Sequence, residues 1–166
     1  MSSISSARRW RAISVGLLSA MVVAALGASA TDIGPWYQDL QKPSWNPPVW
    51  AFGPAWTVIF ALTAISGISA WLGATHKGVR QRILITFALN GLLNVLWSEL
   101  FFRFHRPDWA LLEVVVLWLS IIAMMQVVSL VSLTSVRLLS AYLAWVTFAG
   151  ILNLEIVRLN GPFASS

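Results

Sequence analysis

The sequence predicts an all-α integral membrane protein, folded as one bundle of five transmembrane helices. Of its 166 residues, 58% are hydrophobic and only 10% are charged, whereas soluble domains carry about 25% charged residues. The mean hydropathy is +0.75, and charge-poor stretches recur at the length of about 20 residues that crosses a bilayer. We expect a single domain over residues 1–166, with spans at 12–30, 49–75, 83–102, 109–136 and 138–157.

The first span allows two interpretations. Arg8, Arg9 and Arg11 precede an apolar run that ends in small residues at 28–30, which also fits a cleaved secretory signal peptide. Against cleavage, small residues recur every fourth position, a pattern that lets helices pack closely in lipid. These residues are Gly16, Ala20, Ala24 and Ala28.

The first connector, residues 34–51, has the sequence GPWYQDLQKPSWNPPVWA. Pro43, Pro47 and Pro48 fix φ and lack a backbone donor, so the first span cannot continue through them as a helix. A stiff connector rich in tryptophan, between two apolar runs, predicts a lid over a flat apolar ligand at the membrane surface.

The basic residues predict the orientation. Five spans place seven of them on the side of the N-terminus: Arg8, Arg9, Arg11, Lys77, Arg80, Arg82 and Arg137. The other side holds Lys42, Arg103, Arg106 and Arg158. The positive-inside rule therefore places the N-terminus in the cytoplasm and the first connector outside. Because these residues flank apolar runs, the net charge of +5 does not indicate nucleic-acid binding.

All six acidic residues fall on the side of the first connector, and three of them lie within predicted spans. Ionisable groups are costly there and usually face the bundle interior or a polar cavity. Glu99 and Glu155 have an arginine four and three residues later, so a local ion pair at the interface explains them equally well. Glu113 has no basic partner at helical spacing and is the better functional candidate.

Two spans carry stripes of amide and aromatic side chains along one face. One stripe consists of Asn90, Asn94, Trp97 and Phe101, and the other of Tyr142, Trp145, Ala149 and Asn153. The amides either bond helix to helix or orient a ligand. Together with the lid, the two faces would enclose a cavity whose rings stack on a planar molecule such as a tetrapyrrole or a sterol.

From Trp36 to Asn160, the chain resembles the tryptophan-rich sensory proteins, or translocator proteins (TspO/MBR family). The resemblance rests on WY at 36–37, KPSWNPP at 42–48, Trp56, LNVLWSELFF at 93–102 and AYLAWVTFAGILNLEIVRLN at 141–160. It implies a five-helix homodimer that binds porphyrins and haem-related tetrapyrroles. The implied ligand residues are Trp36, Trp45, Asn46, Trp56, Asn90, Asn94, Trp97, Phe101, Tyr142, Trp145, Ala149 and Asn153.

The chain departs from the family pattern at two places. Glu99 stands where many members have proline, which predicts a straighter helix there. Leu154 and Glu155 occupy the tyrosine positions of the animal cholesterol motif before Arg158. A sterol therefore stays a possible ligand without that motif.

The leading functional hypothesis is a tetrapyrrole-binding receptor or regulator with no obligatory cofactor, in which Lys42 or an arginine meets the ligand carboxylates. One alternative is a transporter with Glu113 or Glu155 as a proton-linked carboxylate. Another is light-dependent degradation of porphyrin by tryptophan. Conventional enzymes and metal sites are disfavoured, because the chain has no cysteine and His76 and His105 fall on opposite sides of the membrane.

Overall fold

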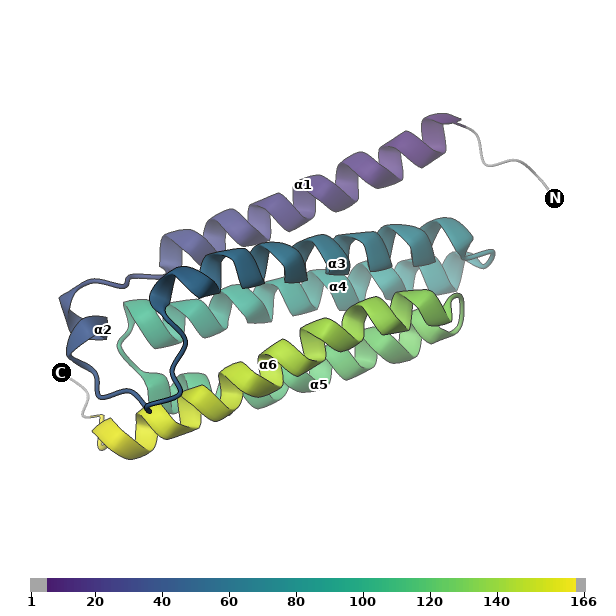
Figure 1. Ribbon diagram of the computed structural model, residues 1–166. Coiled ribbons are helices and arrows are strands. Elements are labelled where there is room, and N and C mark those ends of the chain that lie inside the picture. Colours follow the sequence, from purple (N-terminus) through teal and green to yellow (C-terminus); the bar gives the residue numbers. More distant parts are fainter. Residues whose placement is uncertain (1–5, 164–166) are drawn as a thin grey trace.

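The computed structural model describes residues 6–163, except the side chain of Arg8. In this part of the chain, five long helices form a bundle and a short helix lies in the first connector (Figure 1). The long helices are α1 (Ser6–Ala30), α3 (Phe52–Gly73), α4 (Lys77–Ser98), α5 (Pro107–Ser129) and α6 (Leu133–Asn160). The shorter elements are α2 (Pro35–Asp39), a 3₁₀ turn at Val49–Ala51 and a π-helical turn at Glu99–Arg103.

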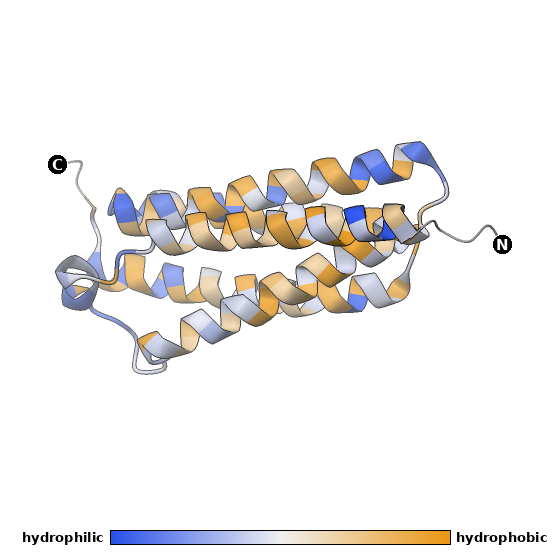
Figure 2. Cartoon of the chain, turned by 90° about the horizontal axis from the view of Figure 1, so that it is seen from above, coloured by the Kyte–Doolittle hydropathy of each residue, from blue (hydrophilic) through white to orange (hydrophobic). Residues whose placement is uncertain are grey.

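Apolar residues dominate the middle of the bundle, and hydrophilic residues gather at its two ends (Figure 2). The five long helices are long and apolar enough to cross a bilayer. Large apolar side chains such as Leu92 and Leu112 are more than 70% exposed, an arrangement that lipid favours and water does not. The protein is thus a multi-pass integral membrane protein with the predicted five helical spans.

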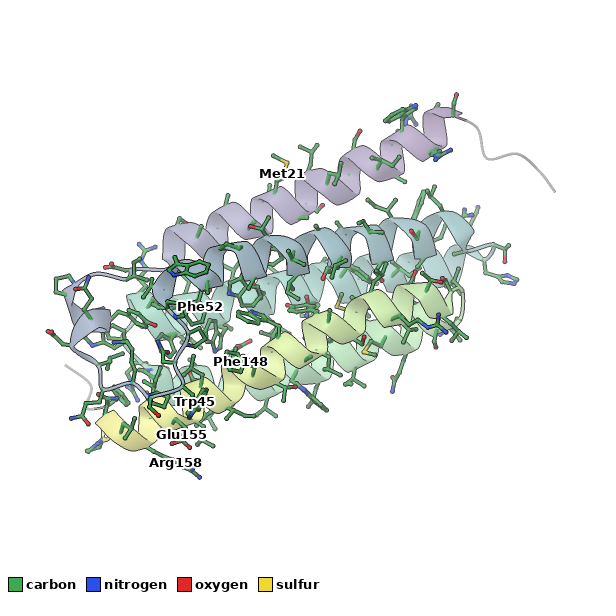
Figure 3. The ribbon with its side chains drawn as sticks, in the orientation of Figure 1. Met21, Trp45, Phe52, Phe148, Glu155 and Arg158 are labelled. Atoms are coloured by element: carbon green, nitrogen blue, oxygen red, sulfur yellow. The ribbon has the colours of Figure 1, made fainter. Side chains whose placement is uncertain are left out.

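The helices pack unequally. α5 lies between α4 and α6, and α3 packs against α6, whereas α1 lies at the outside against α3 and α4 (Figure 1). Met21 of α1 points away from the bundle (Figure 3). Two glycines let α1 approach: a Cβ on Gly16 would lie 2.5 Å from Ile68, and one on Gly91 would lie 2.9 Å from Val23.

Several helix boundaries differ from those predicted. The break between the spans expected at 109–136 and 138–157 lies earlier in the chain. The α5 helix ends at Ser129, and α6 begins at Leu133. The Ser132 side chain caps α6 by accepting a hydrogen bond from the Ser135 amide at 3.3 Å. The prediction placed the break at Arg137, the nearest charge, and overlooked this serine cap. The third span also starts at Lys77 and not at 83.

The prediction of a straighter helix at Glu99 is wrong. The α4 helix continues into a π-helical turn, in which the Phe104 amide donates to the Glu99 carbonyl at 2.9 Å. Such a turn accommodates an extra residue and here leaves two consecutive rings, Phe101 and Phe102, only 2% and 9% exposed. A regular helix would place neighbouring side chains about 100° apart. The loss of proline therefore did not produce a regular helix.

A hydrogen-bonded network joins three helices inside the bundle. The Tyr142 hydroxyl of α6 donates to Asn90 Oδ1 and accepts from Asn94 Nδ2, each at 3.2 Å. Asn90 Nδ2 donates to the Ser120 hydroxyl of α5 at 2.8 Å. All three α4 and α6 residues are at most 4% exposed. The two amides thus connect helices, as one of the two interpretations of the stripe expected.

Replacing Tyr142 with Phe should destabilise the bundle by about 0.6–1.7 kcal/mol, because lipid offers no other partner to the two amides. Thermal unfolding of the detergent-purified protein measures the change. Ser140→Ala is the matched control, since its hydroxyl bonds only the Arg137 carbonyl of its own helix. Equal midpoints for the two variants would contradict a structural role for the network.

Candidate functional site

A cavity of about 560 Å³, here called the lid cavity, lies at the connector end of the bundle. Its walls come from α1, α3, α4, α6, the π-helical turn and the first connector. The lining residues are Ala24, Gly27, Ala28, Thr31, Ile33, Tyr37, Val49, Trp50, Phe52, Gly53, Trp56, Thr57, Phe60, Asn94, Trp97, Ser98, Phe101, Phe102, Trp145, Ala149, Leu152, Asn153 and Ile156. This volume falls within the range of about 300–1,000 Å³ that is usual for ligand sites.

Aromatic rings from three helices meet at the walls of the lid cavity. Trp56 of α3 lies edge-on to Trp145 of α6, with ring centroids 6.1 Å apart and an interplanar angle of 87°. Trp97 of α4 and Phe101 of the π-helical turn also line the cavity, with ring centroids 5.5 Å apart. Phe52, at the start of α3, is 6.1 Å from Trp145 (Figure 3). The cavity therefore presents several ring faces and edges to a ligand.

Three buried polar atoms of residues that line the lid cavity have no hydrogen-bond partner in the described part of the chain. They are the indole Nε1 atoms of Trp97 and Trp145 and the Oδ1 atom of Asn153. The other end of the Asn153 amide is used, since Nδ2 donates to the Pro107 carbonyl at 2.9 Å. Buried polar groups are nearly always paired. Two indole donors and one amide acceptor of the lining residues are thus unsatisfied within the described part of the chain.

The first connector is fixed over this end of the bundle. Lys42 Nζ donates to the carbonyls of Tyr37, Gln38 and Leu40 and lies 4.5 Å from the Tyr37 ring centroid. Desolvation lowers the pKa of Lys42, although nearby Asp39 opposes this effect. The sequence suggests that Lys42 meets the ligand carboxylates. In the structure its three donors are used at the end of α2, so none is left for a ligand.

A second attachment ties the connector to the end of α6. The Gln41 amide donates to Asn160 Oδ1, and Asn160 Nδ2 donates back to the Gln41 carbonyl, both at 2.8 Å. Asn160 Nδ2 also reaches the Ile156 carbonyl at 2.8 Å. Lys42 thus fixes the conformation of the lid from within, and Gln41 ties the lid to α6.

Seven of the twelve residues that the family resemblance implies line the lid cavity. They are Trp56, Asn94, Trp97, Phe101, Trp145, Ala149 and Asn153. Asn90 and Tyr142 lie deeper, in the network, and line a second cavity together with Asn94. Asn94 thus contributes to both cavities.

The remaining three residues belong to the first connector and do not line the lid cavity. Trp36 stacks on His105 with ring centroids 4.1 Å apart, at a turn where His105 has φ of 53°. Trp45 packs on Phe148 of α6 at 5.8 Å (Figure 3) and is 45% exposed. Asn46 donates to the neighbouring Pro47 carbonyl at 2.8 Å. In this structure the three residues thus contact neighbours that lie outside the lining of the lid cavity.

Several lining residues were not predicted from the sequence. Tyr37, Trp50 and Phe52 come from the first connector and the start of α3, and Phe102 comes from the π-helical turn. Small residues of α1 also form part of the wall, among them Ala24 and Ala28. Their four-residue spacing predicts close helix packing, but it does not indicate that they line a cavity. The aromatic character of the connector was the available signal for Trp50.

The three intramembrane acids occupy different environments. Glu99 pairs with Arg103 at 3.6 Å and Glu155 with Arg158 at 2.8 Å, and the latter pair lies at the connector end of α6 (Figure 3). These pairs confirm the local partners expected from helical spacing. Glu113 is 8% exposed, and neither carboxyl oxygen has a partner among the described residues.

Comparison with known proteins identifies the family of the chain. A model of the TspO/MBR family matches residues 14–159. The Tryptophan-rich protein TspO of Chlorobaculum tepidum is 35% identical over 150 residues, which cover 90% of this chain and 94% of that protein. Protein CrtK of Rhodobacter capsulatus is 36% identical, with 89% and 95% covered. The human Translocator protein is 35% identical, with 75% of each chain covered. The chain therefore belongs to the TspO/MBR family.

Proposed function

We propose that this protein is a membrane receptor or regulator that binds a tetrapyrrole of the porphyrin or haem type in the lid cavity. The observation that carries the proposal is an aromatic-walled cavity with two unpaired indole donors, from Trp97 and Trp145. A flat conjugated macrocycle offers large faces that stack on such rings. A flexible acyl chain has no comparable match to these walls.

The polar atoms define how such a ligand is held. The buried N–H groups of Trp97 and Trp145 would gain acceptors, and an unmade hydrogen bond of this kind costs about 1–3 kcal/mol. No lysine or arginine is among the lining residues. Because an isolated charge in an apolar cavity is costly, the ligand carboxylates belong at the mouth of the cavity, near the lid. The macrocycle would then occupy the interior.

The same proposal includes the orientation and the assembly. An N-terminus in the cytoplasm is supported by Arg9, Arg11, Lys77 and Arg82, which lie near the ends of α1 and α4 that face away from the connector. A homodimer, as the resemblance implies, would cover part of the exposed apolar surface. Neither property changes the chemistry of the lid cavity.

Transport of the ligand is a second candidate, favoured by one observation. Glu113 is a buried carboxyl group within a span and has no partner among the described residues. Intramembrane carboxyl groups often mark proton relays. A proton-coupled carrier would use such a group, whereas a receptor would not need it.

The double variant Trp97→Phe, Trp145→Phe should bind protoporphyrin IX at least about tenfold more weakly, because two hydrogen bonds of about 1 kcal/mol each are lost. Titration followed by the porphyrin absorbance avoids the change in tryptophan fluorescence. Trp118→Phe is the control, since its Nε1 bonds Thr147 at 2.9 Å and the ring lies outside the lid cavity. Equal affinities for both variants would refute the proposed site.

Replacing Glu113 with Gln should leave protoporphyrin binding within about twofold, since the carboxyl group does not line the lid cavity. Proteoliposomes with an imposed pH gradient measure porphyrin flux in parallel. The receptor proposal expects no gradient-driven flux in either protein. Flux that disappears in the variant would favour the carrier. Loss of porphyrin absorbance under illumination but not in the dark would instead favour photochemical degradation.

The orientation is testable because the chain has no cysteine of its own. A cysteine at Ser44 of the first connector should react with a membrane-impermeant maleimide in intact cells. A cysteine at Gly78, on the opposite end of the bundle, should react only after permeabilisation. Both positions are exposed, so the reverse pattern would invert the proposed orientation.

A further inference from the structure

A second cavity of about 600 Å³, here called the α1 groove, lies between α1, α3 and α4. It starts at Arg11 near the N-terminal end of α1 and reaches Val23. Val15 and Leu84 line it and are more than 50% exposed, so the groove opens toward the surrounding lipid. The lid cavity lies at the other end of the same helices.

The groove has the length of one leaflet. From Arg11 to Val23, α1 rises about 18 Å at about 1.5 Å per residue. Half of a hydrocarbon core of about 30 Å is about 15 Å. Because α1 crosses the membrane, the groove runs in the direction that lipid chains take in a bilayer.

The walls of the groove suit a flexible apolar chain. Small and aliphatic residues such as Ala20, Ile68 and Ile83 form much of its surface. Its polar floor is satisfied in part: Asn90 and Tyr142 bond within the network, whereas the Thr63 hydroxyl has no partner among the described residues. The lid cavity, by contrast, has unpaired indole donors and facing rings. The two spaces therefore favour different ligand chemistry.

Charge at the mouth of the groove selects an anionic headgroup. Arg11 lines the mouth and is exposed. All six acidic residues of the sequence lie toward the opposite end of the bundle, and so do the three ion pairs of the described residues. The cations at this end thus have no acidic partner in the protein. Such a surface attracts anionic lipids.

From the length, the apolar walls and this charge, we infer that the α1 groove binds one acyl chain of an anionic phospholipid whose phosphate contacts Arg11. The groove adjoins the lid cavity, with which it shares Phe60 and Asn94, but its lipid ligand goes beyond the proposed function. Bound lipid would fill the space along α1, which is otherwise the least packed helix of the bundle.

Native mass spectrometry of the detergent-purified full chain tests this inference with dioleoyl phosphatidylglycerol and dioleoyl phosphatidylcholine, which have the same chains. We expect the anionic lipid to bind about fivefold more tightly, and Arg11→Gln to remove that preference. Arg9→Gln is the charge control, since Arg9 is outside the groove on the same helix. Equal binding of both lipids, or equal losses in both variants, would overturn the proposal.

A second pair of variants tests the groove itself. Ala20→Leu, which fills it, should weaken both lipids, whereas Ala25→Leu on the exposed face of α1 should not. Unchanged lipid binding in Ala20→Leu, or a change only in the dimer fraction, would assign the groove to packing or to a second copy and refute the proposal. Protoporphyrin titration of Arg11→Gln should match the parent protein, so failure of this inference leaves the lid cavity untouched.

Discussion

The hydrogen-bonded network of Tyr142, Asn90, Asn94 and Ser120 is the constraint on which the arrangement of the bundle depends. In lipid, apolar side chains gain little by leaving their surroundings, so helix association relies on close packing and interhelical hydrogen bonds. This network joins α4, α5 and α6 near the middle of the bundle. Asn94 also lines both cavities, so the same side chain that joins the helices forms part of each site.

The two cavities differ in chemistry because different elements close them. The connector and the π-helical turn bring aromatic rings to the lid cavity, with Trp50 from one and Phe102 from the other. The α1 groove is closed mainly by helix faces and carries Arg11 at its mouth. Lys42, the cation of the lid itself, bonds the carbonyls at the end of α2. This division is the reason why we propose a flat ligand at one end and an anionic lipid at the other.

Much of the site was predictable from periodicity. The stripe of Asn94, Trp97 and Phe101 repeats with helical spacing, and the structure places all three at one wall. The break between α5 and α6 was not predictable from charge or proline, because its signal is a single serine cap at Ser132. The π-helical turn at Glu99 was also missed, since it depends on burying Phe101 and Phe102 against other helices.

The sequence by itself determined the membrane class, the five spans and the faces on which polar residues lie, because length, hydropathy and helical spacing are local properties. Only the tertiary structure decided which faces share a cavity. Trp36 and Trp45 were predicted as ligand residues and Trp50 was not, yet of the three only Trp50 lines the lid cavity. The difference arises because the connector is held by distant contacts, such as that of Gln41 with Asn160, and these contacts set where each ring points.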